Sequence, residues 1–359
     1  MPFTAPCAKA VGVSSMTSVP TNSSGGPFNP TNSCFSFLNY ITQVNNNYES
    51  NYNGLQVTLT GRNYYGLSFS GSYTYAHALG DASDQGTAAD FPTPLNSYGS
   101  IRQQLYANTD FDIRHRFTLS ADYALPSKKG FGQLLEGWSV NTVVVLTSGL
   151  PWGLADLSDD FSGTNAIGST AQNEGEKWNF WGNPSDFTPV HGWTDTNGGW
   201  ENGGGGLPYS GNNPAILTQC MNADIAHYSG NQLALAEQSL AAIGCYAVGN
   251  SVLAPPPYGS YGNTKSNIFR DDGFKNVDFS VAKLFTIKEN LKAQFRAEFF
   301  NIANHPHWSN PSGGPGGAIQ DPSAQPFGFV GLTPDTYSSN PQLGSGGARS
   351  MQLGLKLSW

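Results

Sequence analysis

Two histidines in the C-terminal part of the chain have a spacing that can serve metal chemistry. His305 and His307 flank a proline in "HPHW", and two imidazole groups could supply half of a metal site. A proline between two polar residues is also typical of a surface turn. We favour the turn and expect no metal ligands here.

An acidic segment offers a second candidate for metal binding. Asp156, Asp159 and Asp160 in "DLSDDFSG" could hold Ca²⁺ through their carboxylates. The segment lacks the spacing and the terminal Glu of an EF-hand loop, so a solvated acidic loop is favoured. The segment "RDDGF" (270–274) is likewise predicted to form a turn that leads into a strand.

Groups that could act in catalysis are not assembled into a recognisable motif. His77 and His115 lie in or beside strand-like segments without an accompanying serine or cysteine motif. The sequence also has no HExxH, no P-loop and no GxGxxG in a strand-turn-helix setting. We therefore expect a protein that is not an enzyme, with no catalytic residue and no cofactor.

The four cysteines point to loop disulfides. They are widely spaced and form no CxxC pair, which argues against a zinc site. In an oxidising compartment the simplest pairing is Cys7 with Cys34 and Cys220 with Cys245. Four unpaired thiols are the alternative.

The composition favours an all-β protein with uncharged polar surfaces. Only 12% of the residues are charged, 13% are aromatic, and the chain contains 43 Gly. This mixture suits many strands joined by long loops better than helical bundles or βαβ units. The net charge of −8 argues against a nucleic-acid partner, which needs a basic face.

Seven segments alternate between apolar and polar residues, as β-strands with one apolar and one polar face do. The predicted strands are 53–62, 66–79, 112–123, 137–148, 276–286, 291–301 and 351–359. In the sixth, Lys292, Arg296 and Glu298 share one face, which would be costly inside a sandwich core and is acceptable beside water.

Short and long connections alternate between these strands. The short ones are "NYYG", "ALPSKKGFGQLLE" and "IKEN", and the long ones span about 80–111, 147–275 and 302–347. Short turns on one side and long loops on the other are typical of an outer-membrane barrel. The sequence has no run of 18 apolar residues that would form a transmembrane helix.

The long loop 147–275 contains one predicted helix. Apolar residues recur near helical spacing in 231–244, with Asn231 as N-cap and Gly244 as the stop. We expect this helix to pack on an extracellular cap beside Cys245. Four tryptophans of the same loop could stack on a sugar or another substrate, or pack the cap, and both interpretations stay open. They are Trp178, Trp181, Trp193 and Trp200.

A combination of five segments carries a family resemblance. The segments are "YNGLQVTLTGRNYYGLSFSGSYTYAHAL" (52–79), "DIRHRFTLSADYALP" (112–126), "GWSVNTVVVLTSGLPW" (137–152), "FKNVDFSVAKLFTIKENLKAQFRAEFFNIANHPHW" (274–308) and "GARSMQLGLKLSW" (347–359). Together they resemble the C-terminal barrel of TonB-dependent outer-membrane receptors, closest to the group in soil bacteria of the acidobacterial type. In that group the N-terminal half carries a carboxypeptidase-regulatory-like domain and a plug.

The resemblance implies an antiparallel, up-and-down transmembrane β-barrel with long extracellular loops, in the outer membrane of a Gram-negative bacterium. It implies a part in the uptake of an extracellular substrate whose identity the sequence does not give. The implied partners are the outer-membrane lipid, the barrel-insertion machinery and the TonB system.

The expected barrel is partial. Receptors of this kind have about 22 strands around a plugged lumen, and seven strands cannot close such a cylinder. With a periplasmic C-terminus, the odd count assigns residues 1–52 to an extracellular loop region and 53–359 to the C-terminal barrel segment. Signal peptide, plug and TonB box are not recognised in the sequence. We therefore expect a fragment of a longer barrel, reached by TonB through the missing N-terminal part.

The last predicted strand is the segment most specific to barrels. Every second residue is apolar, and its end resembles the signal that the insertion machinery reads. The residues are Met351, Leu353, Leu355, Leu357 and Trp359.

A soluble protein is the alternative. A secreted or surface β-sandwich, acting as an adhesin or a carbohydrate-binding protein, would also contain alternating strands. In a sandwich the apolar faces would be buried in a sealed core, whereas in a barrel they would stay exposed to lipid.

Overall fold

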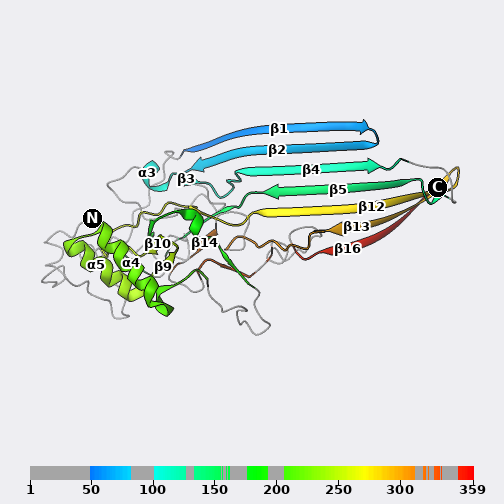
Figure 1. Ribbon diagram of the computed structural model, residues 1–359. Helices are drawn as coiled ribbons and strands as arrows, with labels where there is room; N and C mark the ends of the chain where they lie inside the picture. Colours follow the sequence, from blue (N-terminus) through cyan, green and yellow to red (C-terminus); the bar gives the residue numbers. More distant parts are fainter. Residues whose placement is uncertain are drawn as a thin grey trace, which may run out of the picture.

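The computed structural model describes residues 49–81, 101–126, 133–154, 156, 159, 161, 176–192, 206–311, 318–320, 322, 327–331, 333 and 347–359. These residues form one long antiparallel sheet, with helices and short strands gathered at one end (Figure 1). We call these helices and short strands the cap. The opposite end of the sheet, where strands are joined by short connections, is the turn end.

The main sheet contains the seven predicted strands in chain order. Its strands are β1 (Ser50–Tyr64), β2 (Leu67–Gly80), β4 (His115–Ala124), β5 (Trp138–Thr147), β12 (Phe274–Lys288), β13 (Leu291–Phe300) and β16 (Ser350–Ser358). The two-residue strand β3 (Ala107–Asn108) pairs with β2 at the cap end. The sheet is open, with β1 and β16 as its edges among the described residues. The predicted all-β, antiparallel fold with about seven long strands is confirmed.

The strand register sorts the side chains of the main sheet onto two faces. Val57, Tyr73, Phe117 and Leu146 stand opposite one another on β1, β2, β4 and β5. A second apolar row crosses the other edge and contains Phe279, Phe299 and Met351. Because successive side chains alternate across a strand, these rows share one face, and most of the hydroxyl, amide and charged groups lie on the other.

The β1–β2 hairpin shows how this register is fixed. Tyr65 and Gly66 form a two-residue connection with φ values of 50° and 87°. Positive φ at both central residues is the geometry of a type I′ turn, whose twist matches that of the flanking strands. A Cβ on Gly66 would lie 2.6 Å from the carbonyl oxygen of Ala124, so glycine is also required by the close approach to β4.

The cap has three small sheets around an aromatic core. The first sheet contains β7 (Asn179–Trp181), β10 (Ser251–Ala254) and β9 (Tyr246–Val248). The second contains β11 (Phe269–Arg270), β6 (Pro151–Leu154) and β14 (Ala318–Gln320). The third contains β15 (Phe329–Val330) and β8 (Val190–His191). The ring of Trp152 lies 4.7 Å from Phe269 and 5.7 Å from Phe327, and Tyr246 lies 4.8 Å from Phe327. These rings are buried, so the hydrophobic core of the described chain lies in the cap.

The segment that follows β13 returns to the cap. Strand β14 pairs in parallel with β6, and β15 pairs in parallel with β8. Phe327 belongs to this returning segment and is 1% exposed. The cap core is therefore built from chain on both sides of the β12–β13 hairpin.

The prediction of a single loop helix is wrong, because the loop holds two. These are α4 (Pro214–His227) and α5 (Gly230–Ile243), and the same loop holds the 3₁₀ turns η2 (Pro184–Asp186) and η3 (Ser210–Asn212). A further short helix, α3 (Ile101–Leu105), lies outside this loop. Helix α5 is the predicted one and ends at Gly244 with φ 86°, although its N-cap is Ser229 and not Asn231. Helix α4 has a clear start, since Asn213 accepts from the Ala215 amide ahead of Pro214. Its apolar residues are not confined to one face, which hid it from a search for periodicity.

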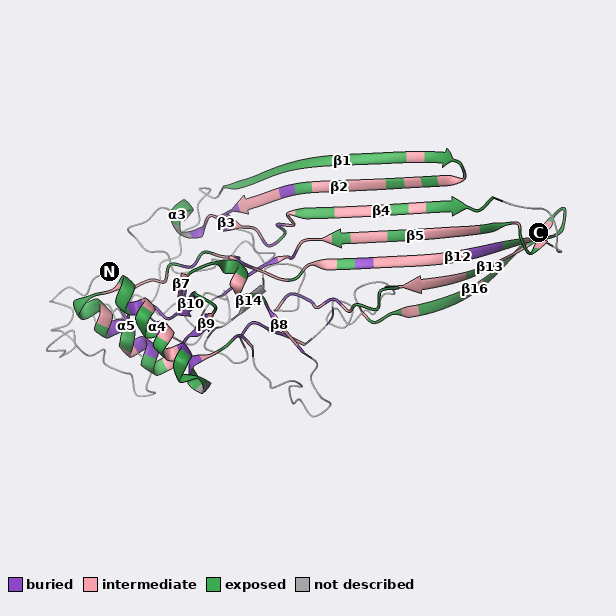
Figure 2. Ribbon diagram, in the orientation of Figure 1, coloured by how far each residue is buried: buried purple, intermediate pink, exposed green. Residues whose placement is uncertain are grey.

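Burial differs between the two parts of the molecule. Figure 2 shows exposed and intermediate residues along most of the main sheet, whereas buried residues gather in the cap. Leu59 on β1 is 66% exposed and Leu355 on β16 is 69% exposed. A β-sandwich would bury these side chains, so the soluble alternative does not fit the apolar face of this sheet.

Candidate functional site

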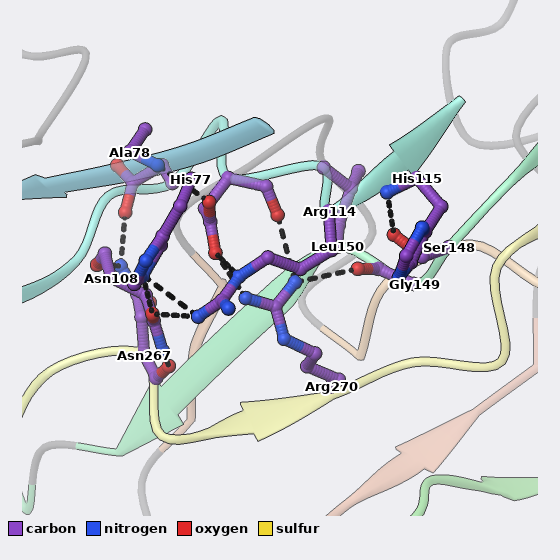
Figure 3. A network of polar contacts seen from close by, with 12 residues as sticks. His77, Ala78, Asn108, Arg114, His115, Ser148, Gly149, Leu150, Asn267 and Arg270 are labelled. Atoms are coloured by element: carbon purple, nitrogen blue, oxygen red, sulfur yellow. Dashed lines mark hydrogen bonds and ion pairs between the residues drawn. The ribbon is translucent and has the colours of Figure 1, made fainter. Parts of the chain in front are cut away.

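A network of polar contacts joins the main sheet to the cap (Figure 3). It lies at the cap ends of β2, β4 and β5, where the chain leaves the sheet for its long connections. Its centre is Asp112, just before β4, which is 1% exposed. Arg270 comes to this carboxylate from β11, so the network ties strands of the sheet to a strand of the cap.

Asp112 accepts hydrogen bonds with both carboxylate oxygens. Oδ1 accepts from the amide of Ala78 at 2.7 Å, and Oδ2 accepts from Nε of Arg114 at 2.7 Å and from Nη2 of Arg270. Burial opposes the charged form, but the hydrogen bonds from Ala78, Arg114 and Arg270 and the charge of Arg270 outweigh it. The pKa of Asp112 is therefore lowered, and the carboxylate stays charged.

Arg114 extends the network along the sheet. Its Nη2 lies 2.7 Å from Nε2 of His77 and 3.1 Å from Oδ1 of Asn108. Asn108 and Asn267 exchange side chain to main chain hydrogen bonds of 2.9 and 3.0 Å, and Asn267 also donates to Asp110. Such reciprocal amide contacts fix the orientation of both side chains.

Arg270 closes the network on the cap side. Its Nη1 donates to the carbonyl oxygens of Asp112 at 2.8 Å and Gly149 at 3.0 Å. The next residue, Asp271, accepts from the amides of Leu150 and Gly273, both at 2.9 Å, and burial raises its pKa to about 6. The segment "RDDGF" leads into β12 as expected, but Arg270 ends β11 and residues 271–273 form an irregular connection, and the part played by Arg270 was missed. Nothing local signals it, since Asp112 lies 158 residues away.

The chemistry of this network is structural. The carboxylate and both guanidinium groups are already hydrogen-bonded to each other and to main-chain groups. Buried, fully bonded networks of this kind rigidify the elements that they join. The arrangement therefore holds the cap in a fixed position on the end of the sheet.

The sequence-predicted metal candidates are not brought together with further ligands. Nε2 of His307 donates to the carbonyl oxygen of Lys275 at 2.5 Å, and the His305 ring lies 5.1 Å from that of His307. In the acidic segment, Asp156 is buried and accepts from Nε1 of Trp178 at 2.8 Å and from the Asp159 amide at 2.9 Å. Among the described residues no cluster of three His, Cys, Asp or Glu side chains could hold a metal. Asp160 lies outside that part of the chain.

The loop tryptophans that the structure describes pack inside the cap. Trp178 is fully buried, and Trp181 stacks on His227 with ring centroids 4.4 Å apart. Trp193 and Trp200 lie outside the described residues. The described pair thus contributes to the cap core.

One expected cysteine pair forms a disulfide in the helical part of the cap. Cys220 on α4 and Cys245, directly after α5, are joined by a disulfide across 25 residues. Both lie in a small buried cluster with Ile216 and Leu240. Cys7 and Cys34 lie outside the described residues, as do residues 1–48 of the predicted loop region.

A buried carboxyl group in α4 was not anticipated from the sequence. Asp224 is fully buried, and neither carboxyl oxygen has a hydrogen-bond partner among the described residues. Burial and the charge of Glu237 raise its pKa to about 7, whereas His227 acts in the opposite direction. The cap therefore contains a group that titrates near neutral pH.

The predicted barrel signal lies on the exposed edge of the sheet. Strand β16 pairs with β13 through one edge, and its apolar residues lie on the apolar face. Trp359, which follows the strand, is 91% exposed. The exposed apolar residues of this strand are Met351, Leu353, Leu355 and Leu357.

The open antiparallel sheet, its two chemically distinct faces and the loops gathered at one end define a protein of the β-barrel membrane class. A family model for the outer membrane beta barrel domain matches residues 8–352, so this chain belongs to the outer membrane β-barrel domain family and resides in the outer membrane. Neither the curated proteins nor the solved structures contain a match. Within the described ranges, no helix is long and apolar enough to span a membrane. In barrels of this class the short turns face the periplasm and the long loops face the outside of the cell.

Proposed function

We propose that this chain forms part of the barrel wall and the extracellular cap of a TonB-dependent receptor that takes up a substrate across the outer membrane. The observation that carries the proposal is the open sheet of seven long strands with a large cap at one end. The sequence resemblance to TonB-dependent receptors supports the same assignment. In those receptors energy from the TonB system acts on an N-terminal plug, while the wall and loops surround the substrate path.

The direction of the edge strands supports a larger barrel. Strands β1 and β16 both run from the cap end to the turn end, since an even number of antiparallel pairings separates them. They cannot pair with each other in the antiparallel manner of bacterial barrels. In lipid their free backbone groups need partners, because each unpaired group costs several kcal/mol. Further wall strands, as in a barrel of about 22, would supply these partners.

The two faces of the sheet suit lipid on one side and a wet lumen on the other. The apolar face exposes large side chains such as Leu59 and Leu355. Lys283 lies on this face near the turn end, and its Nζ donates to the carbonyl oxygens of Gln133 and Glu136. A lysine that brings its charge to a connecting loop is expected at a membrane margin. The polar face carries the ion pair of Arg296 with Glu298, at 3.3 Å, which favours contact with water.

In this proposal β16 is also the segment that the barrel-insertion machinery reads, and no residue of the chain acts in catalysis or holds a cofactor. The described polar clusters support the last point, since the main network is saturated by its own members.

The test is transport by the natural gene product in cells with and without a working TonB protein. We expect the protein in the outer-membrane fraction, and uptake of the substrate that it serves should disappear when TonB is removed. Candidate substrates can be screened by growth on scarce nutrients. Uptake that persists without TonB would refute the energy-dependent mechanism and indicate passive diffusion through the barrel.

A further inference from the structure

We propose that Lys275 and Arg349 bind the phosphate groups of an anionic glycolipid in the outer leaflet, whose acyl chains lie along β12, β13 and β16. The inference rests on the outer-membrane location of the chain and on this edge of the sheet. It does not depend on TonB or on transport.

Lys275 stands at the cap end of the apolar face. It pairs across the sheet with Leu146 and lies two residues before Val277 on the same side of β12. Its side chain is exposed, and none of the described residues forms an ion pair with it. A lysine at the extracellular end of a lipid-facing row is placed at the depth of the lipid headgroups.

Arg349 directly precedes the edge strand β16 at its cap end. It is exposed, lies two residues before Met351, and likewise has no carboxylate partner among the described residues. Two strand spacings and one two-residue step separate it from Lys275, which corresponds to about 12 Å between Cα atoms. Two long basic side chains at this distance can reach one phosphate together or two phosphates of one headgroup.

Asn301 joins the loop after β13 to the segment before β16. It directly follows β13, is 1% exposed and has a φ of 48°. Its Nδ2 donates to the carbonyl oxygens of His305 at 3.0 Å and Gly347 at 2.8 Å. The same loop binds the Arg349 amide through Oδ1 of Asn304, at 3.1 Å. The loop after β13 and the start of β16 are thus fixed against each other.

Other titratable groups lie near this margin. His305 is exposed beside the two cations, while burial together with the charges of His305 and Lys275 lowers the pKa of His307. Of the acidic groups on the same segment, Asp271 is partly buried next to Arg270, and Asp272 lies 3.3 Å from Nδ1 of His191. Asp278 lies on the polar face and accepts from the Asn301 amide.

The surface below this site is suited to acyl chains. Phe279, Phe299 and Met351 form one row across β12, β13 and β16, and Val281, Ala297 and Leu353 form the next. Both rows lie on the apolar face directly below the two basic residues. A phosphate at the margin and hydrocarbon below it are the two parts of an anionic glycolipid, which is why we commit to this occupant and not to free phosphate.

The test measures the lipid that stays bound to the protein extracted from outer membranes. The natural protein, the double variant Lys275→Gln/Arg349→Gln and the control Lys292→Gln/Lys356→Gln are each incubated with purified bisphosphorylated lipid A and with its dephosphorylated form. Native mass spectrometry then counts bound lipid. The control removes two cations from the polar face near the turn end.

We expect the natural protein and the control to retain bisphosphorylated lipid A, with at least a fivefold loss in the double variant and weak retention of the dephosphorylated form. Equal retention by the double variant, or equal retention of both lipids, would overturn the proposal. Complete displacement by millimolar inorganic phosphate would show a phosphate site without lipid selectivity and would also overturn it. If the double variant does not reach the membrane, the test is a salt titration of the natural protein. The amount of bound lipid should then fall as the ionic strength rises, and retention that does not depend on salt would contradict an electrostatic site.

Discussion

Replacement of Asp224 by Asn should remove a pH dependence from the stability of the cap. The carboxyl group is fully buried, and its pKa in the folded protein is raised to about 7 from an ordinary value of 3.8. Between these two values the folded protein holds a proton that the unfolded chain releases. Stability is therefore highest at low pH and is lost as the pH rises toward 7.

The size of the effect follows from the same two values. A rise from 3.8 to about 7 corresponds to about 4 kcal/mol between the ends of the titration. Between pH 5 and pH 8, the natural protein should lose about 2–3 kcal/mol of unfolding free energy from this group. Asp224→Asn cannot ionise, so its stability should match the natural protein near pH 5 and exceed it at pH 8.

The measurement is denaturant-induced unfolding of the cap in detergent, followed by near-ultraviolet circular dichroism of its buried aromatic rings. Glu237→Gln is the matched control, because it removes the repulsive neighbour and keeps Asp224. This control should shift the pH dependence to lower pH without abolishing it. Parallel curves for the natural protein and Asp224→Asn from pH 5 to 8 would refute the reasoning.

Three further substitutions test other parts of the molecule. Arg270→Gln leaves buried Asp112 with one guanidinium partner and should destabilise the attachment of the cap by about 2–4 kcal/mol, measured as faster hydrogen exchange at the Ala78 amide. Arg270→Lys should restore part of the lost stability, and unchanged exchange in Arg270→Gln would show that the network is dispensable. Cys245→Ser opens a disulfide that spans 25 residues and should cost the cap about 3 kcal/mol, whereas the same substitution measured in reducing buffer should show no difference from the natural protein. Leu355→Lys places a charge in the middle of the apolar face and should reduce the free energy of folding into lipid vesicles by about 2–4 kcal/mol. Gln352→Lys on the polar face should leave this free energy nearly unchanged, and equal effects of the two substitutions would contradict the assignment of faces.

The long strands were readable from the sequence because alternation is a local property. In each of the seven, apolar residues predominate at alternate positions, and the positive-φ turn at Gly66 keeps the register that the alternation implies. The predicted bounds differ from those observed by a few residues, as fraying strand ends allow.

The fold of the cap could not be predicted from the sequence, because it does not depend on local patterns. Its strands have two to four residues, too few to show a period, and they pair across long separations, as β6 does with β14. Contacts such as Asp112 with Arg270 depend on the completed fold and leave no local signal. Helix α4 had a recognisable Asn-Pro start at Asn213, so attention to capping could have found it where periodicity did not.

The path of the chain through the cap sets an order for assembly. Trp152 and Tyr246 need Phe327 to complete their aromatic contacts, and β6 and β8 need β14 and β15. These partners are delivered by the segment that follows β13. The cap therefore reaches its final packing only when the segment after β13 has joined it, so most of the chain must be present before the cap is complete.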